Sequence, residues 1–308
     1  MNFQYYLFKY FSKLVSLLPY GIVIVLGKLL GHLYYYVVPR QRRLASAHIQ
    51  RGLSISAEEA DLIVRRLFVK IGMTFFEVLY MPALTPENIK RHVLMGDRHY
   101  MDEAVKQGHG VVLLTAHVGN WEWLGAALAM AGFPLTSVIK RQPNDQHTRL
   151  LNEYRQMVGI EIFARGTTEL IGAAKALKKG KILGFLADQD AGDSGIFVEF
   201  LGEMASTPVG PAAFARKFKS PIVPTFIVRC PEGGHRVLMY PPLYYEDTGD
   251  EAADLRRVTE AMTRVLEDTI RTYPDEWLWF QRRWNTKYEK HGRREEQTQR
   301  ERKAGEAV

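Results

Sequence analysis

The segment after an apolar run at residues 111–115 holds the side chains best suited to chemistry. His117 comes two residues after the run, Glu122 comes five residues after His117, and Asn120 stands between them. An imidazole near neutral pH can act as a general base, and a carboxylate can orient it and stabilise its protonated form. His117 and Glu122 are therefore a candidate base and its orienting partner.

This pairing requires a particular local structure. The apolar run predicts a buried strand, and Asn120 is a helix-capping residue placed before a predicted helix at 121–131. His117 and Glu122 would diverge on one continuous helix, so His117 must lie in the turn and fold back over the helix start. Ligands of α/β proteins bind at such strand ends, where helix N–H groups can hold negative charge. The alternative is a loop histidine beside a capped helix, with Glu122 favourable only to the helix dipole.

A second polar cluster, Asp188, Gln189 and Asp190, follows a predicted strand at 182–186. Such carboxylates can bind a metal, orient a substrate or hydrogen-bond their own turn. The nearby sequence Gly192-Asp-Ser-Gly195 imitates the nucleophile segment of trypsin-like proteases. We reject that interpretation, because those proteases are double β-barrels and this chain is rich in helix patterns.

Basic residues gather in the middle of the chain. Lys140 and Arg141 directly follow a predicted strand, and Arg155 and Arg165 come shortly after. The guanidinium group makes paired hydrogen bonds to phosphate or carboxylate. We expect these four residues to bind anionic groups of a substrate.

Composition narrows the class of protein. The 308 residues (35.3 kDa) are 46% hydrophobic and 24% charged, which excludes a mostly disordered chain and a bundle of membrane spans. The net charge of +7 favours a negatively charged partner. The single cysteine, Cys230, cannot form an internal disulfide or a cysteine-rich zinc site, so we expect exposure to the cytosol. No P-loop, G-x-S-x-G elbow or convincing dinucleotide fingerprint is present.

The elements that must position these residues alternate along the chain. Short apolar runs and helical stretches follow one another, which predicts an α/β domain with a central, mostly parallel sheet flanked by helices. A capping box at residues 56–59 opens a further helix that ends before Pro82, and a long helix ends at Pro274. The predicted strands are 111–115, 135–139, 182–186, 196–200 and 222–228, and the helices between them are 121–131, 146–158, 168–179 and 208–217.

The N-terminal segment at 14–38 is the most lipid-like part of the sequence, although Lys28 and His32 interrupt it. Its uncharged run at 14–27 would reach only about 21 Å as a helix, short of a hydrocarbon core of about 30 Å. Basic residues flank the segment and tyrosines cluster at 34–36, which favours an anchor lying in the membrane interface. The alternative is a buried core helix.

We therefore expect four regions. These are a membrane-anchoring segment at 1–40, a helical extension at 41–90, an α/β domain at 91–288 and a disordered charged tail at 289–308.

The chain contains six short sequence blocks that, in their order along the chain, resemble the bacterial lipid A biosynthesis acyltransferases of the lysophospholipid acyltransferase superfamily. The resemblance covers about residues 5–288. His117 and Glu122 match the family's H-x-x-x-x-[DE] motif. One departure is Gln281, where a histidine is common, and we assign it no proton transfer. The remaining blocks are Lys140-Arg-Gln-Pro-Asn144, Ala187-Asp-Gln-Asp190, Val198-Glu-Phe-Leu-Gly202 with Thr207, Pro221-Ile-Val-Pro224 and Trp279-Phe-Gln-Arg-Arg-Trp-Asn-Thr-Lys287.

The resemblance implies a glycerolipid acyltransferase-like fold and transfer of a fatty acyl chain from acyl carrier protein, or from coenzyme A, to a hydroxyl of a lipid A precursor. It implies His117 as general base, Glu122 as its partner, and Asn120 among the substrate-binding residues with the basic residues and the 188–190 cluster. It requires no cofactor, no metal and no nucleic acid. Its expected location is the cytoplasmic face of the inner membrane, as a peripheral or monotopic protein.

Three alternatives stay open at this stage. The family also includes members that acylate mannosylated phosphoinositides. Asp188 and Asp190 would suit a metal-assisted hydrolase or phosphotransferase. A basic scaffold on the membrane surface, without catalysis, would show the same charge and the same apolar N-terminal segment.

Overall fold

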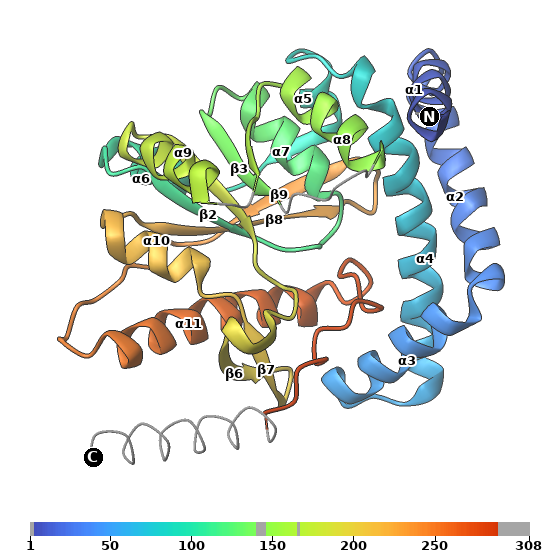
Figure 1. The fold of residues 1–308 in the computed structure, drawn as a ribbon. Coiled ribbons are helices and arrows are strands. Elements are labelled where there is room, and N and C mark those ends of the chain that lie inside the picture. Colours follow the sequence, from blue (N-terminus) through green and yellow to red (C-terminus); the bar gives the residue numbers. More distant parts are fainter. Residues whose placement is uncertain (1–2, 140–145, 165–166, 289–308) are drawn as a thin grey trace.

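The computed structural model describes residues 3–139, 146–164 and 167–288, and its central feature is a seven-stranded sheet (Figure 1). The strands lie in the order β1-β9-β8-β2-β5-β3-β4, and every neighbouring pair is parallel except β8 and β9. This confirms the predicted α/β class. The strands of this sheet are β1 (Val93–Met95), β2 (Val111–Thr115), β3 (Leu135–Ile139), β4 (Glu161–Ala164), β5 (Ile182–Leu186), β8 (Ile222–Arg229) and β9 (His235–Met239).

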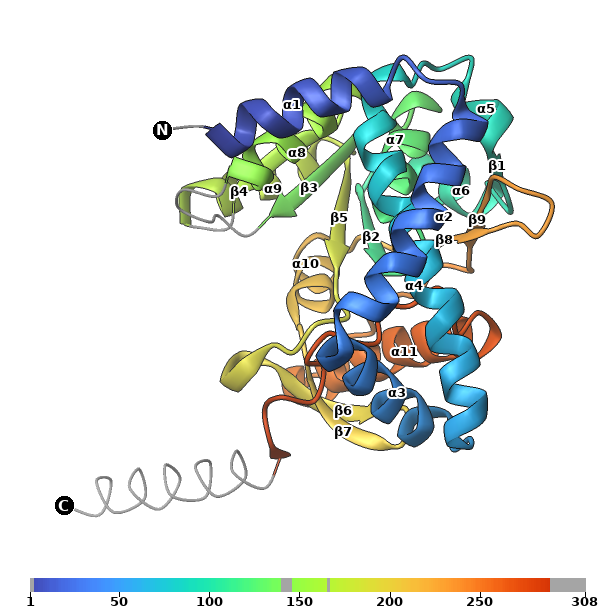
Figure 2. The same cartoon turned by 90° about the vertical axis from the view of Figure 1, so that its right-hand side faces the viewer.

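Helices cover both faces of the sheet and form a separate layer at one side (Figures 1 and 2). The predicted helices at 121–131, 146–158, 168–179 and 208–217 are confirmed within one or two residues. The helices are α1 (Phe3–Val15), α2 (Tyr20–Val37), α3 (Pro39–Leu53), α4 (Ala57–Tyr80), α5 (Ile89–His92), α6 (His99–Lys106), α7 (Trp121–Met130), α8 (Gln146–Met157), α9 (Thr167–Lys178), α10 (Gly210–Phe218) and α11 (Glu251–Thr272), with short 3₁₀ turns η1 (Met81–Ala83) and η2 (Gly192–Ser194).

Strand β2 lies in the middle of the sheet and is buried along its whole length. Side chains alternate between the two faces of a strand. Val111 and Leu113 accordingly pack in the core under α6, α7 and α8, whereas Val112 and Leu114 pack in the core under α9, α10 and α11. The uninterrupted apolar run at 111–115 therefore reflects a strand covered on both faces.

The predicted strand at 196–200 forms, but it lies outside the main sheet. It is β6 (Ile196–Phe200), which pairs in antiparallel fashion with β7 (Glu203–Thr207). Only Leu201 and Gly202 separate the two strands, and both have positive φ, 51° and 81°. A two-residue turn with positive φ at both positions matches the right-handed twist of the strands on either side of it. Strand β6 therefore forms a hairpin with β7, the next strand in the chain.

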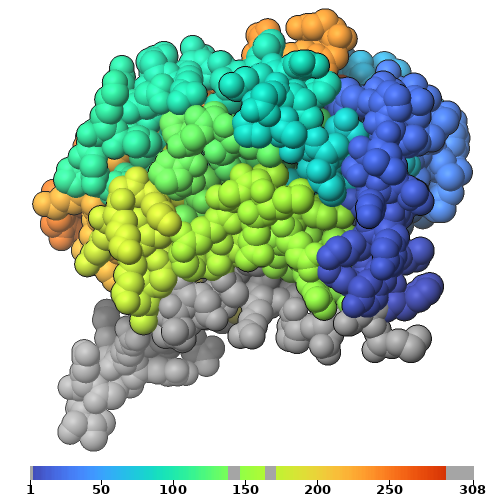
Figure 3. Space-filling model, turned by 90° about the horizontal axis from the view of Figure 1, so that it is seen from above, coloured from blue at the N-terminus to red at the C-terminus, as the bar shows by residue number. Residues whose placement is uncertain are grey.

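The apolar segment at 14–38 is divided between two helices. Helix α1 ends at Val15 and α2 begins at Tyr20, so the run at 14–27 is not the single helix whose length was compared with the hydrocarbon core. The physical reason is Pro19, which cannot donate the backbone hydrogen bond that a continuing helix needs. Helix α1 lies across α8 (Figures 2 and 3). Helix α2 runs alongside α4 at one margin of the molecule (Figure 1).

Helices α2 and α4 touch backbone to backbone. A Cβ added to Gly27 would lie 2.5 Å from Met73 Cα, and one added to Gly72 would lie 2.3 Å from Gly27 O. Glycine at these positions lets the two helices approach closely enough to exclude side chains between them. The predicted tail at 289–308 lies outside the described residues.

Candidate active site

The pairing of β2 with β5 places His117 beside Asp188. Thr115 and Leu186, the last residues of these strands, are partners in the parallel register. His117 follows Thr115 by two residues, and Asp188 follows Leu186 by the same number. Because carboxyl ends of parallel strands meet at one edge of the sheet, both side chains lie at the edge where ligands of such folds bind.

Two hydrogen bonds join these residues. Asp188 Oδ2 accepts the backbone N–H of His117 at 2.9 Å, and Asp188 Oδ1 lies 2.8 Å from Nδ1 of the imidazole. Since an ionised carboxylate only accepts, Nδ1 carries the proton in this pair and Nε2 is left as the basic nitrogen. Among the described residues, no hydrogen bond occupies Nε2, and the His117 side chain keeps 14% of its surface exposed.

The electrostatics of the pair favour a poised base. Burial of His117 by itself opposes the charged imidazolium, but the charge and hydrogen bond of Asp188 outweigh this and raise the pKa of His117 above its ordinary value. Burial likewise opposes ionisation of Asp188, yet the charge of His117 and the hydrogen bonds around the carboxylate hold the pKa of Asp188 well below its usual range. Asp188 is therefore ionised wherever His117 titrates.

Glu122, the expected partner of His117, has a different contact. Its carboxylate accepts two hydrogen bonds from Arg155, Nε to Oε2 at 2.8 Å and Nη2 to Oε1 at 2.5 Å, and a third from Trp121 Nε1 at 3.1 Å. Among the described residues, no hydrogen bond joins Glu122 to the imidazole. The reason is that α8 packs against α7 and directs Arg155 at the first turn of α7. Glu122 acts on His117 through its charge, which favours the imidazolium.

The shape of the turn depends on Gly119 and Asn120. Gly119 has φ +60°, and a Cβ there would lie 2.0 Å from Ile227 O, so only glycine fits. The Asn120 side chain accepts the backbone N–H of Trp123 at 3.1 Å and so caps α7, as predicted. Asn120 was also expected to bind substrate, but its side chain is fully buried and its amide is bound to Glu77, so it faces the protein core.

The segment that follows α11 supplies a wall of the site that sequence reasoning missed. Gly119 N–H donates to Glu276 O at 2.9 Å, and Leu278 N–H donates to His117 O at 3.1 Å. The indole of Trp277 and the amide of Gln281 donate to Asp188 Oδ2 at 2.8 and 2.9 Å. The family block at 279–287 gave a signal for Gln281, which donates to Asp188, but none for Glu276 and Trp277, which precede it.

Gln189 and Asp190 lie beside this wall. Asp190 accepts from the backbone N–H and the hydroxyl of Thr286, whereas Gln189 is exposed. Both residues line a pocket of about 260 Å³ together with Gln281 and residues 282, 283 and 285. The pocket adjoins Asp188 through Gln281, so these residues stay candidates for contact with a substrate.

Three of the four basic candidates, Lys140, Arg141 and Arg165, lie outside the described residues. The fourth, Arg155, is bound to Glu122. Within residues 3–139, 146–164 and 167–288, no group of three His, Cys, Asp or Glu side chains is arranged to hold a metal ion. Burial raises the pKa of the Cys230 thiol, which disfavours the reactive thiolate.

The chain matches the family model of bacterial lipid A biosynthesis acyltransferase over residues 2–286. It is 28% identical to the phosphatidylinositol mannoside acyltransferase of Mycolicibacterium smegmatis over 235 residues, 74% of each chain. It is 27% identical to the lipid A biosynthesis lauroyltransferase of Escherichia coli K12 over 280 residues, which is 90% of this chain and 89% of the relative. The lipid A biosynthesis palmitoleoyltransferase of the same strain is 24% identical over 279 residues, 88% of this chain and 87% of the relative.

Proposed function

Because the chain belongs to the bacterial lipid A biosynthesis acyltransferase family, we propose that it transfers a fatty acyl chain from a thioester donor to a hydroxyl of a membrane glycolipid. The observation that carries this proposal is the contact between His117 and Asp188 at the carboxyl edge of the sheet. A histidine held by a buried carboxylate, with its second nitrogen unoccupied, suits removal of a proton from a hydroxyl.

The reaction proceeds in two steps without a covalent acyl-enzyme. Nε2 of His117 takes the proton of the acceptor hydroxyl as that oxygen attacks the thioester carbonyl, and Asp188 stabilises the imidazolium. The tetrahedral intermediate then expels the thiolate, which takes the proton back from His117, so the products are an ester and a free thiol. Backbone N–H groups at the start of α7 stabilise the oxyanion. Glu122 and Arg155 fix this helix start from the side of α8.

The acceptor we favour is a lipid A precursor, because two relatives that align along nearly the whole chain are named lipid A acyltransferases. The alternative acceptor is a phosphatidylinositol mannoside, which the name of the Mycolicibacterium relative supports. The donor we favour is an acyl carrier protein, with coenzyme A as the alternative. Both donors and both acceptors are anionic, and the net charge of +7 suits each of them.

We place the protein on the cytoplasmic face of the inner membrane as a monotopic protein. Among the described residues, α2 is the one helix long and apolar enough to cross a bilayer. However, α2 contacts α4 through the backbone. Helix α4 is part of the protein core, where it carries the ionised Glu77, so it cannot follow α2 into a bilayer. A membrane-spanning α2 would therefore have to break its contact with α4. Exposed apolar side chains instead occur along α1, the turn after it and α2: Phe3, Leu7, Tyr10, Leu14, Leu17, Ile22, Val25, Leu29, Leu33 and Tyr36.

Lys28 and His32 lie exposed among these apolar side chains in the middle of α2. A charged group at that depth is costly inside a hydrocarbon core, whereas a lysine at the interface extends its ammonium to the headgroups. This supports a helix that lies in the plane of the membrane surface.

The test is a transfer assay with the purified full chain in phospholipid vesicles. Palmitoyl-acyl carrier protein and palmitoyl-coenzyme A are each offered with a lipid A precursor and with a phosphatidylinositol mannoside, and mass spectrometry measures the acylated lipid. We expect one acceptor to gain a palmitoyl ester with the wild type and neither to gain it with His117→Ala. Absence of ester in all four combinations would refute the proposal for these substrates.

Two further measurements, one in the same assay and one in cells, address the other candidate functions. Activity that survives EDTA contradicts a metal-assisted reaction at Asp188 and Asp190, whereas activity that returns only with a divalent metal would favour it. If the protein is a basic scaffold without catalysis, the His117→Ala variant expressed in a deletion strain should restore the wild-type phenotype in full. Failure of His117→Ala to do so excludes the scaffold.

A further inference from the structure

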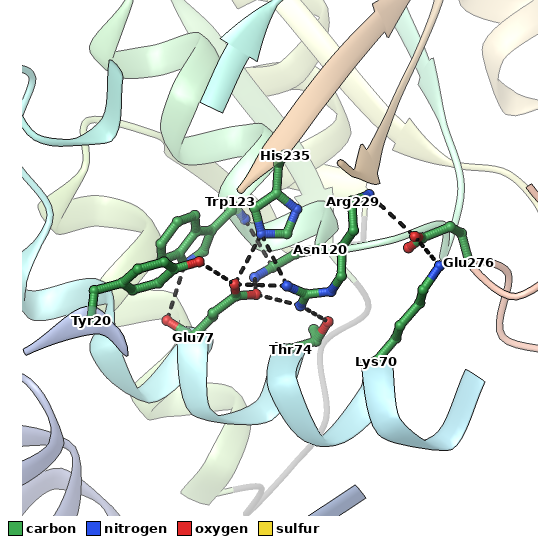
Figure 4. Close-up of polar contacts among 9 residues, drawn as sticks. All are labelled: Tyr20, Lys70, Thr74, Glu77, Asn120, Trp123, Arg229, His235 and Glu276. Carbon is green, nitrogen blue, oxygen red and sulfur yellow. Dashed lines mark hydrogen bonds and ion pairs between the residues drawn. The ribbon is translucent and has the colours of Figure 1, made fainter. Parts of the chain in front are cut away.

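A second buried polar cluster lies directly behind the catalytic turn, and Glu77 of α4 is at its centre (Figure 4). The Glu77 side chain is fully buried. An ionised carboxylate in the core is strongly destabilising unless surrounding donors compensate it. The proposed reaction does not use Glu77, so the groups around Glu77 must explain how a buried carboxylate is tolerated there.

Five donor groups from four elements or turns converge on the Glu77 carboxylate, as Figure 4 shows. Oε1 accepts from Tyr20 Oη at 2.7 Å and from Arg229 Nη1 at 2.9 Å, and it lies 3.0 Å from His235 Nε2. Oε2 accepts from Arg229 Nη2 at 2.6 Å and from Asn120 Nδ2 at 2.9 Å. Glu77 therefore joins α2, the end of β8, the start of β9 and the turn that carries His117.

Glu77 is ionised in this setting. Burial opposes its charge, but the nearby charges of Arg229 and His235 outweigh burial and hold the pKa of Glu77 well below its usual range. The same attraction raises the pKa of Arg229, whose burial alone would lower it. The carboxylate is thus a fixed negative centre with strong hydrogen bonds.

Asn120 connects this centre to the catalytic turn. Its Oδ1 caps α7, and its Nδ2 binds Glu77. Trp123, in the first turn of α7, also donates its indole N–H to Glu77 O at 3.0 Å. At the other end of the turn His117 is bound to Asp188, and in the middle Gly119 is bound to Glu276.

Helix α4 contacts the turn directly through Glu77, which binds Asn120. It acts on the turn indirectly through Lys70, which binds Glu276 Oε1 at 2.6 Å, while the backbone oxygen of Glu276 accepts from Gly119. All four residues of the turn make hydrogen bonds, and three of them bind distant parts of the chain, so the turn has little freedom to rotate. Reaction rates depend steeply on such fixation, since a displacement of about 1 Å can cost about 10²-fold.

We propose that Glu77 is a positioning residue for acyl transfer, which acts through Asn120 to hold residues 117–120 where His117 meets Asp188. This proposal rests on the proposed function. Glu77 itself does not touch the reacting atoms.

Asn120→Ser is the variant that isolates this link. Serine supplies a cap oxygen for α7 but lacks the amide that reaches Glu77. Glu77→Gln is a poorer choice, because it leaves the buried Arg229 without its counter-charge. Asn120→Thr serves as the second variant if Asn120→Ser does not fold, since threonine also provides a cap oxygen.

Tyr20→Phe is the matched control. It removes one neutral donor from the same carboxylate, as Asn120→Ser does, but it does not touch the catalytic turn. Its ring keeps the stacking position on Trp123, where the ring centroids are 5.7 Å apart. A purely structural role of the cluster predicts similar effects of Tyr20→Phe and Asn120→Ser.

Two readouts are measured on the full chain. Steady-state kinetics use release of free thiol from palmitoyl-acyl carrier protein or palmitoyl-coenzyme A, with the acceptor identified by the transfer assay. NMR of protein labelled with ¹⁵N-histidine follows the titration of His117, whose signal is the one missing from His117→Gln. The NMR readout needs no substrate, so it tests the positioning role even if the proposed reaction is wrong.

For Asn120→Ser we expect kcat to fall about tenfold or more, with KM of the donor within about twofold of the wild type. We expect the titration midpoint of His117 to fall toward or below 6.5, because loosening of the contact with Asp188 leaves burial to dominate. Tyr20→Phe should change neither quantity by more than about twofold. An unchanged midpoint and kcat in Asn120→Ser, or equal effects of both variants, would overturn the proposal.

Discussion

Nδ1 of His117 lies 2.8 Å from Oδ1 of Asp188, and the two residues follow neighbouring parallel strands by the same two positions. The contact is therefore a direct consequence of the register between β2 and β5. Asp188 is fully buried under Trp277 and Gln281, which donate to its second oxygen. These hydrogen bonds fix the position of the Asp188 carboxylate before any substrate binds.

His117→Ala should lower kcat by about 10² to 10⁴, the usual cost of losing a general base. Stability should fall as well, because the buried Asp188 loses the imidazole as a partner and keeps only the donors Trp277, Gln281 and the backbone N–H of residue 117. The measurement is steady-state kinetics with donor and acceptor both present, with urea unfolding in parallel. A near-normal rate in a folded variant would remove His117 from the mechanism.

Asp188→Asn should move the acidic limb of the pH–rate profile to lower pH. His117 must be neutral to act as a base, so activity of the wild type rises as pH rises through a raised His117 pKa, above 6.5. Without the negative charge, burial dominates and the pKa falls below that value. We expect kcat to fall about 10²-fold or more as well. A limb that does not move would show that Asp188 does not control His117.

Glu122→Ala should cost stability as well as activity. It leaves Arg155, a largely buried cation, without its carboxylate, which is expected to cost about 3 kcal/mol. Activity should fall less than in His117→Ala, because Glu122 acts on the imidazole only through its charge and through the position of α7. Urea unfolding checks the first expectation, and kcat checks the second. Glu251→Ala, which removes an exposed partner of Arg216, is the control and should change stability far less.

Gly119→Ala should impair activity out of proportion to its size. The added methyl group would lie 2.0 Å from the carbonyl oxygen of Ile227, so the turn that carries His117 must shift. Gly132→Ala has a similar positive φ of 91° but open space around it, and it serves as the control for backbone strain alone. We expect kcat to fall at least tenfold in Gly119→Ala and less than about twofold in Gly132→Ala.

Leu29→Glu combined with Leu33→Glu should release the protein from vesicles that contain anionic phospholipid. Both side chains are about 60% exposed on the outer face of α2, so the packing against α4 is left intact. Co-sedimentation with vesicles measures binding, and circular dichroism checks the fold. Met157→Glu, at an exposed apolar residue of α8, should bind like the wild type. Full binding of the double variant would contradict the proposed membrane face.

Much of the local structure follows from the sequence alone. The apolar run at 111–115, the cap at Asn120 and the helix after it place His117 in a turn at the end of a strand. The positive φ of Gly119 and the hairpin between β6 and β7 arise from residues within a few positions of one another. Such features depend on steric and hydrogen-bonding preferences that act over less than about ten residues.

The partner of His117 was decided only by the tertiary structure. Strands β3 and β4 come between β2 and β5 in the chain, yet β5 lies directly beside β2 in the sheet. Strand order depends on which helices cover each face and on the crossover connections between strands, and neither is encoded near His117. The same reason pairs Glu122 with Arg155 through the packing of α7 on α8, and Asn120 with Glu77 through the packing of α4 behind the turn. The sequence alone thus identifies the residue types that can do the chemistry. Long-range packing decides which carboxylate binds His117, Arg155 and Asn120.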